Sequence, residues 1–263
     1  MTDWLALCRA ASDDVRGVLG ELGTRRDREP VVGQGEGGDE TTVIDAAAER
    51  VVLERFRAVD GVTVVSEEAG EVGAGGRFTV VVDPIDGSLN AKRGVPHFSL
   101  SIAIADGMRM GDVFFGYVYD FGSGEEWTAE RGRGAFLDGN LLDGELPKEK
   151  MEILAFEATL TSSVAEKAAA VVGLAYRLRI MGSLALALCY LAAGRVDGVC
   201  SLKPARSMDI AAAQLLVRER GLAIELPEAP PLVDAPLDAV GRSRVFAAAN
   251  GDRCAELFAA LSA

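Results

Sequence analysis

The chain has 263 residues, of which 49% are apolar and 25% are charged, fractions that are ordinary for a globular protein and do not indicate a disordered chain. Its length is sufficient for one large or two modest domains with a substantial buried core. The formal net charge of −13 excludes binding of nucleic acid through overall electrostatics, so a phosphate compound would need a local basic site or a metal ion.

The cysteine and histidine content restricts the chemistry further. The four cysteines are far apart and form no C-x-x-C pair, so neither a thiolate metal site nor a disulfide framework is indicated. The single histidine, His97, opens a strand-like run, and we expect it to be structural. The first residues lack a signal-peptide pattern, and no apolar run is long enough to cross a bilayer. We therefore expect a cytoplasmic protein without a membrane partner.

Helical signals come first along the chain. Apolar spacing predicts amphipathic helices over residues 3–22 and 42–56, with a flexible glycine-rich loop at 33–39 between them. Runs of strand-forming residues separated by turn signals follow. They predict strands at 62–65, 78–82, 98–105, 112–119 and 126–130.

After about residue 140 strand and helix patterns alternate, which is typical of an α/β layer. The predicted strands are 153–156, 177–180, 198–200 and 245–249. The predicted helices are 162–172, 183–193, 207–220 and 252–261. We therefore predict an N-terminal α+β half over residues 1–140 and a C-terminal α/β half over residues 141–263.

The segment 80–88 joins an apolar strand to two carboxylates, Asp83 and Asp86, on either side of a proline. Proline fixes the bend, so the two carboxylates can converge with the carbonyl of Ile85 between them. Hard oxygen ligands at this spacing suit Mg²⁺. The backbone N–H groups that follow can bind an anion, and they belong to Gly87 and Ser88. The alternative interpretation is a strand followed by an acidic turn.

Other acidic residues lie at comparable positions. Glu67 and Glu68 end the strand predicted at 62–65, and Asp45 stands near the start of the second helix. Asp209 begins a later helix, where the alternative role is an N-terminal cap. Composition by itself does not bring these side chains together in space.

Taken together, these segments resemble the inositol monophosphatase family of metal-dependent sugar phosphatases. The matching segments are 42–45, 66–68, 83–90 and 208–212, in the family's order and spread over most of the chain. The likeness is greatest to archaeal-type enzymes that act on both inositol phosphates and fructose 1,6-bisphosphate. It rests on segments 33–39, 66–70, 90–94, 114–119 and 179–183. The resemblance implies a layered αβαβα sandwich with the site between the two halves, and a homodimer.

The resemblance also implies two to three Mg²⁺ ions, with Mn²⁺ as a substitute. One ion would be held by Glu67, Asp83 and the Ile85 carbonyl, and a second by Asp83, Asp86 and Asp209. A third, weaker ion would bind near Glu67. These ligands lie in the N-terminal half except for Asp209.

The remaining site residues follow from the same resemblance. Asp45, with a hydroxyl from Ser88, Thr41 or Thr42, would orient or deprotonate the attacking water, and Glu68 is grouped with these catalytic residues. The N–H groups of the 87–88 turn would stabilise the phosphoryl oxygens. Attack would be in line and would form no phosphoenzyme.

Three departures from the family pattern concern the site. Ser88 replaces the usual threonine and keeps the hydroxyl, and Met208 replaces a tryptophan. Leu202 falls near the position of a glutamate that grips inositol in animal-type enzymes, which weakens the case for strict inositol preference.

Basic residues indicate a second anionic group on the substrate, as in a sugar bisphosphate. The candidates match basic positions of the archaeal-type pattern, and arginine is suited to phosphate oxygens. They are Arg93, Arg179, Lys203 and Arg206, with Ser183 as a further substrate-binding residue. The alternative interpretation of each basic residue is a surface ion pair.

We therefore predict an Mg²⁺-dependent phosphomonoesterase acting on inositol 1-phosphate, fructose 1,6-bisphosphate or both. One alternative is a phosphatase of the same superfamily for 3′-phosphoadenosine 5′-phosphate or histidinol phosphate. An adenine-stacking aromatic would favour the nucleotide, and the segment 195–209 contains none. The other alternative is a catalytically silent metal- or phosphate-binding regulator, against which the intact carboxylate set counts.

Overall fold

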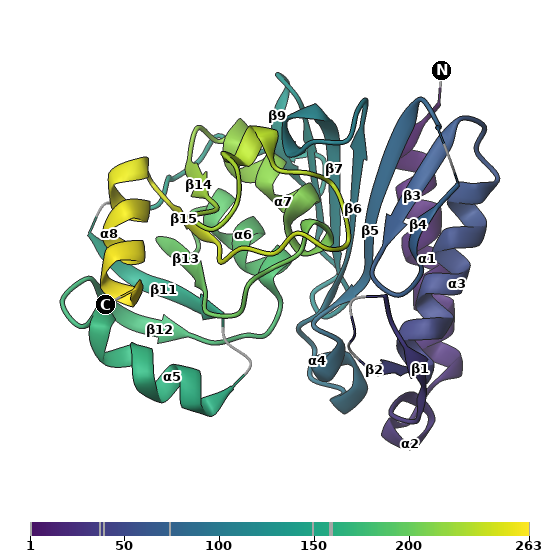
Figure 1. Cartoon of the computed structure of the whole chain (residues 1–263), viewed down its shortest axis with the longest axis horizontal. Coiled ribbons are helices and arrows are strands. Elements are labelled where there is room, and N and C mark those ends of the chain that lie inside the picture. Colours follow the sequence, from purple (N-terminus) through teal and green to yellow (C-terminus); the bar gives the residue numbers. More distant parts are fainter. Residues whose placement is uncertain are drawn as a thin grey trace.

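The computed structural model describes residues 2–36, 38, 40–73, 75–148, 150–157 and 160–262. Helices and sheets alternate in five layers, α, β, α, β and α (Figure 1). The predicted layered sandwich is therefore confirmed. In the part of the chain that is described, no helix is long and apolar enough to cross a membrane.

The helices form the outer and central layers. They are α1 (Trp4–Glu21), α2 (Arg25–Arg28), α3 (Val43–Arg57), α4 (Ser88–Arg93), α5 (Thr161–Lys167), α6 (Leu184–Ala192), α7 (Ser207–Glu219) and α8 (Gly251–Ser262). Helices α1 and α3 cover one face of the larger sheet, α6 and α7 lie between the two sheets, and α5 and α8 cover the far face of the smaller one (Figure 1). Helix α1 begins where it does because the Asp3 carboxylate accepts the N–H of Ala6 at 3.0 Å.

The larger sheet carries most of the acidic residues that the sequence singled out. Its strands are β3 (Val62–Ser66), β4 (Gly70–Val72), β5 (Phe78–Asp86), β6 (Ser99–Ala105), β7 (Val113–Asp120), β8 (Glu126–Glu130), β9 (Gly134–Leu137) and β10 (Asn140–Leu141), in the order β10-β9-β8-β7-β6-β5-β3-β4. Strands β3 and β5 are parallel, with Ser66 opposite Val82. The next residues, Glu67 directly after β3 and Asp83 within β5, therefore lie on neighbouring strands at the same edge of the sheet.

The smaller sheet faces the first across the central helices. Its strands are β11 (Met151–Glu157), β12 (Ala175–Arg179), β13 (Gly198–Ser201), β14 (Ala223–Glu225) and β15 (Phe246–Ala248), in the order β12-β11-β13-β15-β14. Strands β11 and β13 are parallel, with Glu157 opposite Ser201. A separate hairpin of β1 (Val31–Gln34) and β2 (Glu40–Thr42) leads into α3.

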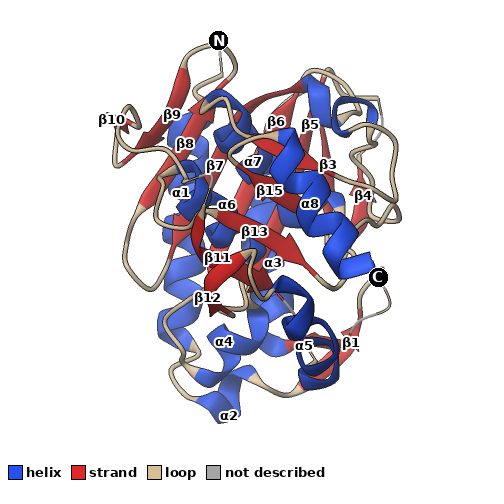
Figure 2. Cartoon of the chain, turned by 90° about the vertical axis from the view of Figure 1, so that its left-hand side faces the viewer, coloured by secondary structure: helices blue, strands red, loops and turns tan. Residues whose placement is uncertain are grey.

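Apolar side chains fill each space between layers. Phe56 of α3 packs on the larger sheet, Leu186 of α6 lies between the sheets, and Phe246 packs beneath α8. Most of α6 is buried, which accounts for the alanine- and leucine-rich composition of this short helix. Figure 2 shows α8 lying across the strands of the smaller sheet.

The longer elements agree with the predicted ones to within a few residues, and the differences lie in short ones. The helix expected over 162–172 ends at Lys167 and continues as a 3₁₀ helix over Ala168–Val171. Part of the loop expected over 33–39 belongs to β1, while Gly37 and Asp39 lie outside the described residues. The expected boundary after residue 140 falls within β10, and the division into two halves stays a prediction.

Several short helices and strands were missed by the sequence analysis because periodicity has few positions to show in them, although strands of similar length such as β13 and β15 were predicted. The missed elements are α2, β1, β2, β4, α4, β9, β10 and β14.

Candidate active site

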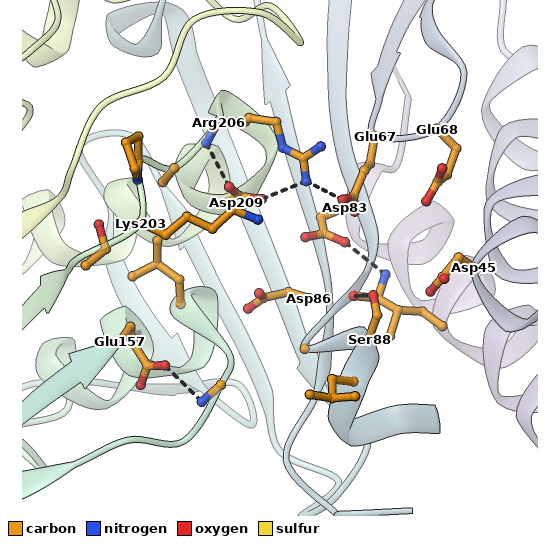
Figure 3. Close-up of a pocket in the computed structure, with 18 of the residues that line it drawn as sticks. Asp45, Glu67, Glu68, Asp83, Asp86, Ser88, Glu157, Lys203, Arg206 and Asp209 are labelled. Carbon is orange, nitrogen blue, oxygen red and sulfur yellow. Dashed lines mark hydrogen bonds and ion pairs between the residues drawn. The ribbon is translucent and has the colours of Figure 1, made fainter. Parts of the chain in front are cut away.

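A cavity of about 320 Å³ lies where the larger sheet, the smaller sheet and the start of α7 meet (Figure 3). Its walls combine carboxylates, hydroxyls and basic side chains. They are Glu40, Asp45, Glu67, Glu68, Asp83, Ile85, Asp86, Gly87, Ser88, Leu89, Lys92, Glu157, Gly182, Leu184, Ser201, Lys203, Pro204, Ala205, Arg206, Asp209 and Arg242.

The end of β5 supplies the centre of the cavity. Asp83 is buried, and its Oδ1 accepts the N–H of Ile85 at 3.0 Å, which closes the bend around the proline. The Ile85 carbonyl accepts the Ser88 hydroxyl at 3.0 Å. Gly87 has φ 93°, in the left-handed region, so the chain turns from β5 into α4 without steric cost.

Asp86 joins the two sides of the cavity. Its Oδ2 accepts the Ser183 hydroxyl at 2.5 Å and the Ala185 N–H at 2.8 Å, at the start of α6. Burial, together with the charge of Asp209, raises the pKa of Asp86 to about 7 although these hydrogen bonds oppose the shift. Ser183 was predicted to bind substrate, and in the structure its hydroxyl bonds to Asp86.

Arg206 connects the other two predicted ligands. Its guanidinium contacts the Glu67 carboxylate, and Nη2 lies 3.8 Å from Asp209 Oδ1 (Figure 3). Its backbone N–H donates to Asp209 Oδ2 at 2.7 Å, in the capping arrangement that the sequence left open. Asp209 thus caps α7 while it also lines the cavity.

Burial, followed by repulsion between carboxylates, governs the electrostatics of the cavity. Burial raises the pKa of Asp83 well above its ordinary value, and the charges of Glu67, Asp86 and Asp209 add to it. Burial also raises the pKa of Glu67 to about 7, although Arg206 opposes the shift. Negative charge at the end of β5 is therefore only partly compensated by the protein.

We tested whether this donor set fits a magnesium ion. Carboxylate oxygens and the Ile85 carbonyl are the hard ligands that Mg²⁺ takes, and a cation would remove the repulsion that raises these pKa values. The side chains as they stand are not closed around one ion: among the described residues no three acidic, cysteine or histidine side chains are grouped for ligation. The guanidinium of Arg206 instead contacts Glu67 and lies near Asp209. The oxygen donors are therefore of the kind that Mg²⁺ takes. To bind the ion, Glu67 and Asp209 would have to be shared between Mg²⁺ and Arg206.

A second acidic group lies on the α3 side. Asp45 Oδ2 accepts the Thr42 N–H at 3.1 Å and its hydroxyl at 2.6 Å, and lies 3.1 Å from Lys92 Nζ. Its Oδ1 is buried and has no hydrogen-bond partner among the described residues. The Thr41 hydroxyl donates to Glu68, whose pKa burial raises. The two threonines hold these carboxylates and do not line the cavity.

Two buried glutamates were missed by the sequence analysis. Glu49 on α3 accepts the Ser66 hydroxyl at 2.5 Å and the N–H groups of Glu68 and Ala69 at 3.1 and 3.0 Å, so it holds the turn after β3. Glu157 lines the cavity at the end of β11. The predicted strand 153–156 stopped one residue short of it, although a strand that ends in a carboxylate is the pattern that marked Asp83.

Of the four basic residues predicted to bind substrate, the structure brings two to the cavity, Lys203 and Arg206. Arg93 is exposed and lies 2.8 Å from Glu29 Oε1, and Arg179 is exposed and donates to the Leu178 carbonyl. Neither belongs to the cavity lining. Arg242, which the sequence analysis did not consider, does belong to it.

Of the three residues noted as departures, Ser88 belongs to the cavity lining, whereas Met208 and Leu202 lie outside it. Met208 is buried beside Asp209 in the core between the sheets, and Leu202 packs with the core beneath α8. His97 also lies outside the lining, with its ring 5.8 Å from that of Tyr190. All four cysteines are free and buried.

The chain is similar to known proteins over most of its length. The model of the inositol monophosphatase family matches residues 4–262. A fructose-1,6-bisphosphatase/inositol-1-monophosphatase of Thermococcus kodakarensis is 35% identical, over 89% of this chain and 87% of that protein. The Nus factor SuhB of Pasteurella multocida is 35% identical over 70% of each. A crystal structure described as an inositol monophosphatase-fructose 1,6 bisphosphatase superposes with TM-score 0.86 at 25% identity, covering 98% of this chain and all of that one.

Proposed function

Because the chain belongs to the inositol monophosphatase family, we propose that it removes phosphate from inositol 1-phosphate and fructose 1,6-bisphosphate. It is a phosphatase, a hydrolase of phosphate monoesters. The observation that carries the proposal is the meeting of Glu67, Asp83 and Asp209 with the turn at residues 87–88 around one cavity.

The family is metal-dependent, and we assign Mg²⁺ to the carboxylate side of the cavity. Glu67, Asp83, the Ile85 carbonyl, Asp86 and Asp209 would hold two to three ions, with Mn²⁺ as a substitute. Bound Mg²⁺ would polarise the phosphoryl oxygens and lower the pKa of a water molecule.

Residues of α3 and the preceding strand would orient the attacking water. The contacts of Asp45 support this role. Its Oδ2 is held by Thr42 and Lys92, while its buried Oδ1 can still accept a hydrogen bond. Glu68, held by Thr41, lies on the same side of the cavity in Figure 3. A carboxylate fixed in this way loses little entropy when it accepts a hydrogen bond from water.

The turn after β5 would receive the phosphate. Gly87 and Ser88 line the cavity next to Asp86, and backbone N–H groups there would donate to phosphoryl oxygens. The Ser88 hydroxyl, which donates to Ile85, keeps its oxygen as an acceptor for water.

Lys203 and Arg242 add positive charge to the cavity lining, and Arg206 adds a third basic group beside Glu67. A bisphosphate would place its second phosphate there, because guanidinium and ammonium groups bind phosphate oxygens well. We leave Arg93 and Arg179 out of this role because they do not line the cavity.

The decisive assay measures phosphate release from inositol 1-phosphate, fructose 1,6-bisphosphate, 3′-phosphoadenosine 5′-phosphate and histidinol phosphate, with Mg²⁺ and with EDTA. We expect EDTA-sensitive turnover of the first two. Activity confined to the last two would refute the substrate assignment. Silence on all four would leave the alternative of a catalytically silent regulator that binds metal or phosphate.

We also propose a cytoplasmic homodimer that binds small sugar or cyclitol phosphates and neither nucleic acid nor membranes. The acidic net charge supports the exclusion of nucleic acid. Analytical ultracentrifugation at micromolar concentration tests the dimer, and a monomeric mass there would refute it.

A further inference from the structure

Glu157 is a cavity residue to which the proposed function assigns no task. It ends β11, on the smaller sheet, and lies opposite Ser201, which ends β13. The carboxyl ends of parallel strands meet at one edge of a sheet, where α/β proteins bind ligands. In Figure 3 Glu157 lies on the far side of Asp86 from Asp45 and Glu68.

The Glu157 side chain is fixed before any ligand arrives. The residue is 7% exposed, and its carboxylate accepts the Gly182 N–H at 2.8 Å and the Met181 N–H at 3.3 Å. Burial raises the pKa of Glu157, while these two N–H groups oppose the shift. A carboxylate offers about four acceptor positions, so two backbone donors leave capacity directed at the cavity.

The neighbours of Glu157 suit the carbon skeleton and hydroxyl groups of a polyol. Ser201 lines the same wall, and its oxygen already accepts the Val245 N–H at 2.8 Å, so its own proton can be donated. Leu184 adds an apolar surface beside them. A phosphate group would be repelled here, because Glu157 and Asp86 are both acidic, whereas a hydroxyl donor would be attracted.

Resting on the proposed function, we propose that Glu157 is a specificity-determining residue that accepts a hydrogen bond from a hydroxyl of the substrate's sugar or cyclitol ring. The phosphate then binds at the turn after β5, and the ring lies against the wall formed by Glu157 and Ser201. If the organic group of a phosphate ester has no hydrogen-bond donor, the buried Glu157 carboxylate stays unsatisfied when that ester binds. Such a substrate is therefore disfavoured.

The test compares inositol 1-phosphate with p-nitrophenyl phosphate, whose aryl group carries no hydroxyl. We expect Glu157→Gln to lower kcat/KM for inositol 1-phosphate by about 10- to 100-fold, and that for the aryl phosphate by less than about threefold. The matched control is Glu49→Gln, which also alters a buried carboxylate with two backbone N–H donors but lies outside the cavity lining. It should lower both values by similar factors.

Equal losses on both substrates in Glu157→Gln, or no loss on either, would overturn the inference while leaving the phosphatase intact. A wild-type protein that hydrolyses neither substrate would instead overturn the proposed function. If the wild-type protein preferred histidinol phosphate to inositol 1-phosphate, the Glu157 carboxylate would be assigned to binding the ammonium group of that substrate. The proposed hydrogen bond from a ring hydroxyl would then be refuted.

A second measurement does not depend on the folding of Glu157→Gln. Wild-type kcat/KM is measured for a series of deoxy-inositol 1-phosphates, each lacking one hydroxyl. We expect one member to lose about tenfold or more. If every member stays within about threefold of the parent compound, no hydroxyl is recognised and the inference fails. Glu157→Asp, which keeps the carboxylate, should retain the preference for inositol 1-phosphate over the aryl phosphate.

Discussion

The guanidinium group of Arg206, at the N-cap of α7, forms an ion pair with the carboxylate of Glu67, which directly follows β3. The two residues are 139 positions apart in the sequence. Arg206 is 6% exposed, so the pair is formed where solvent screens it little. One basic side chain thus offsets part of the repulsion in a carboxylate cluster that is also expected to bind Mg²⁺.

We predict that Arg206→Gln destabilises the metal-free protein by about 3 kcal/mol at pH 8, because Glu67 is left buried without its cationic partner. In Mg²⁺ the loss should be smaller, since the ion then compensates Glu67. Urea unfolding in EDTA and in Mg²⁺ measures both values. Arg179→Gln, at an exposed residue outside the cavity, is the control and should change neither. A loss of the same size in both solutions would contradict the prediction.

Asp83→Asn should lower turnover by about 10³-fold or more, because Asp83 is assigned to two metal positions. The same substitution should raise the unfolding free energy in EDTA by about 1 kcal/mol, since it removes a charge that burial and three acidic neighbours disfavour. Steady-state assays and urea unfolding test the two halves of this prediction. Unchanged turnover would refute the metal assignment.

The stability of the metal-free protein should fall as pH rises from about 4.5 to about 8. Glu67 and Asp86 have folded-state pKa values raised to about 7, so the folded protein binds more protons than the unfolded chain in this range. The slope of the unfolding free energy against pH is then negative. The stability that protonated Glu67 and Asp86 contribute is fully present below their unfolded-state pKa values, and it is lost as pH passes through about 7. We expect a loss of several kcal/mol, measured by urea unfolding in EDTA. Saturating Mg²⁺ is the control and should remove the slope, and stability that rises with pH in EDTA would contradict the prediction.

Gly35→Ala should lower kcat by about tenfold with little change in stability. A Cβ at residue 35 would overlap Glu68 Oε2, so the carboxylate must leave its contact with Thr41. Gly33→Ala, in the same hairpin, is the matched control because a Cβ there meets nothing within 4 Å. Activity assays and thermal melts of both variants provide the measurement. If the two variants were equally active, the position of the Glu68 carboxylate would have no role in catalysis.

Lys203→Ala and Arg242→Ala should each lower kcat/KM for fructose 1,6-bisphosphate by about tenfold relative to inositol 1-phosphate. The reason is that a second phosphate in the cavity loses a cationic partner, whereas a monophosphate does not. Arg93→Ala and Arg179→Ala are the controls, since both residues lie outside the cavity lining. Parallel losses on the two substrates would remove the case for a second anion site.

Much of the fold followed from local patterns in the sequence. Strand-forming runs and helical spacing predicted the long elements, because these depend on residues that are close together in the chain. The same local signals marked Asp83 and Glu67 as strand ends and Asp209 as a helix start. Short elements such as α4 and the β1–β2 hairpin were missed, since turns and pairing with distant strands, rather than periodicity, define them.

Only the tertiary structure decided how the side chains around the cavity are shared. Asp86 and Ser183 are 97 positions apart and meet because α6 packs between the two sheets, and the same packing turns Glu157 towards Gly182. Arg93 and Arg206 look alike in the sequence, yet one pairs with Glu29 at the surface and the other with Glu67 in the cavity. The sequence by itself thus determined the elements and the acidic chemistry, because short-range geometry and residue type specify both. Which partner each charged side chain contacts depended on which layers of helices and sheets pack together. This packing is a property of the whole chain and is not encoded in any one segment.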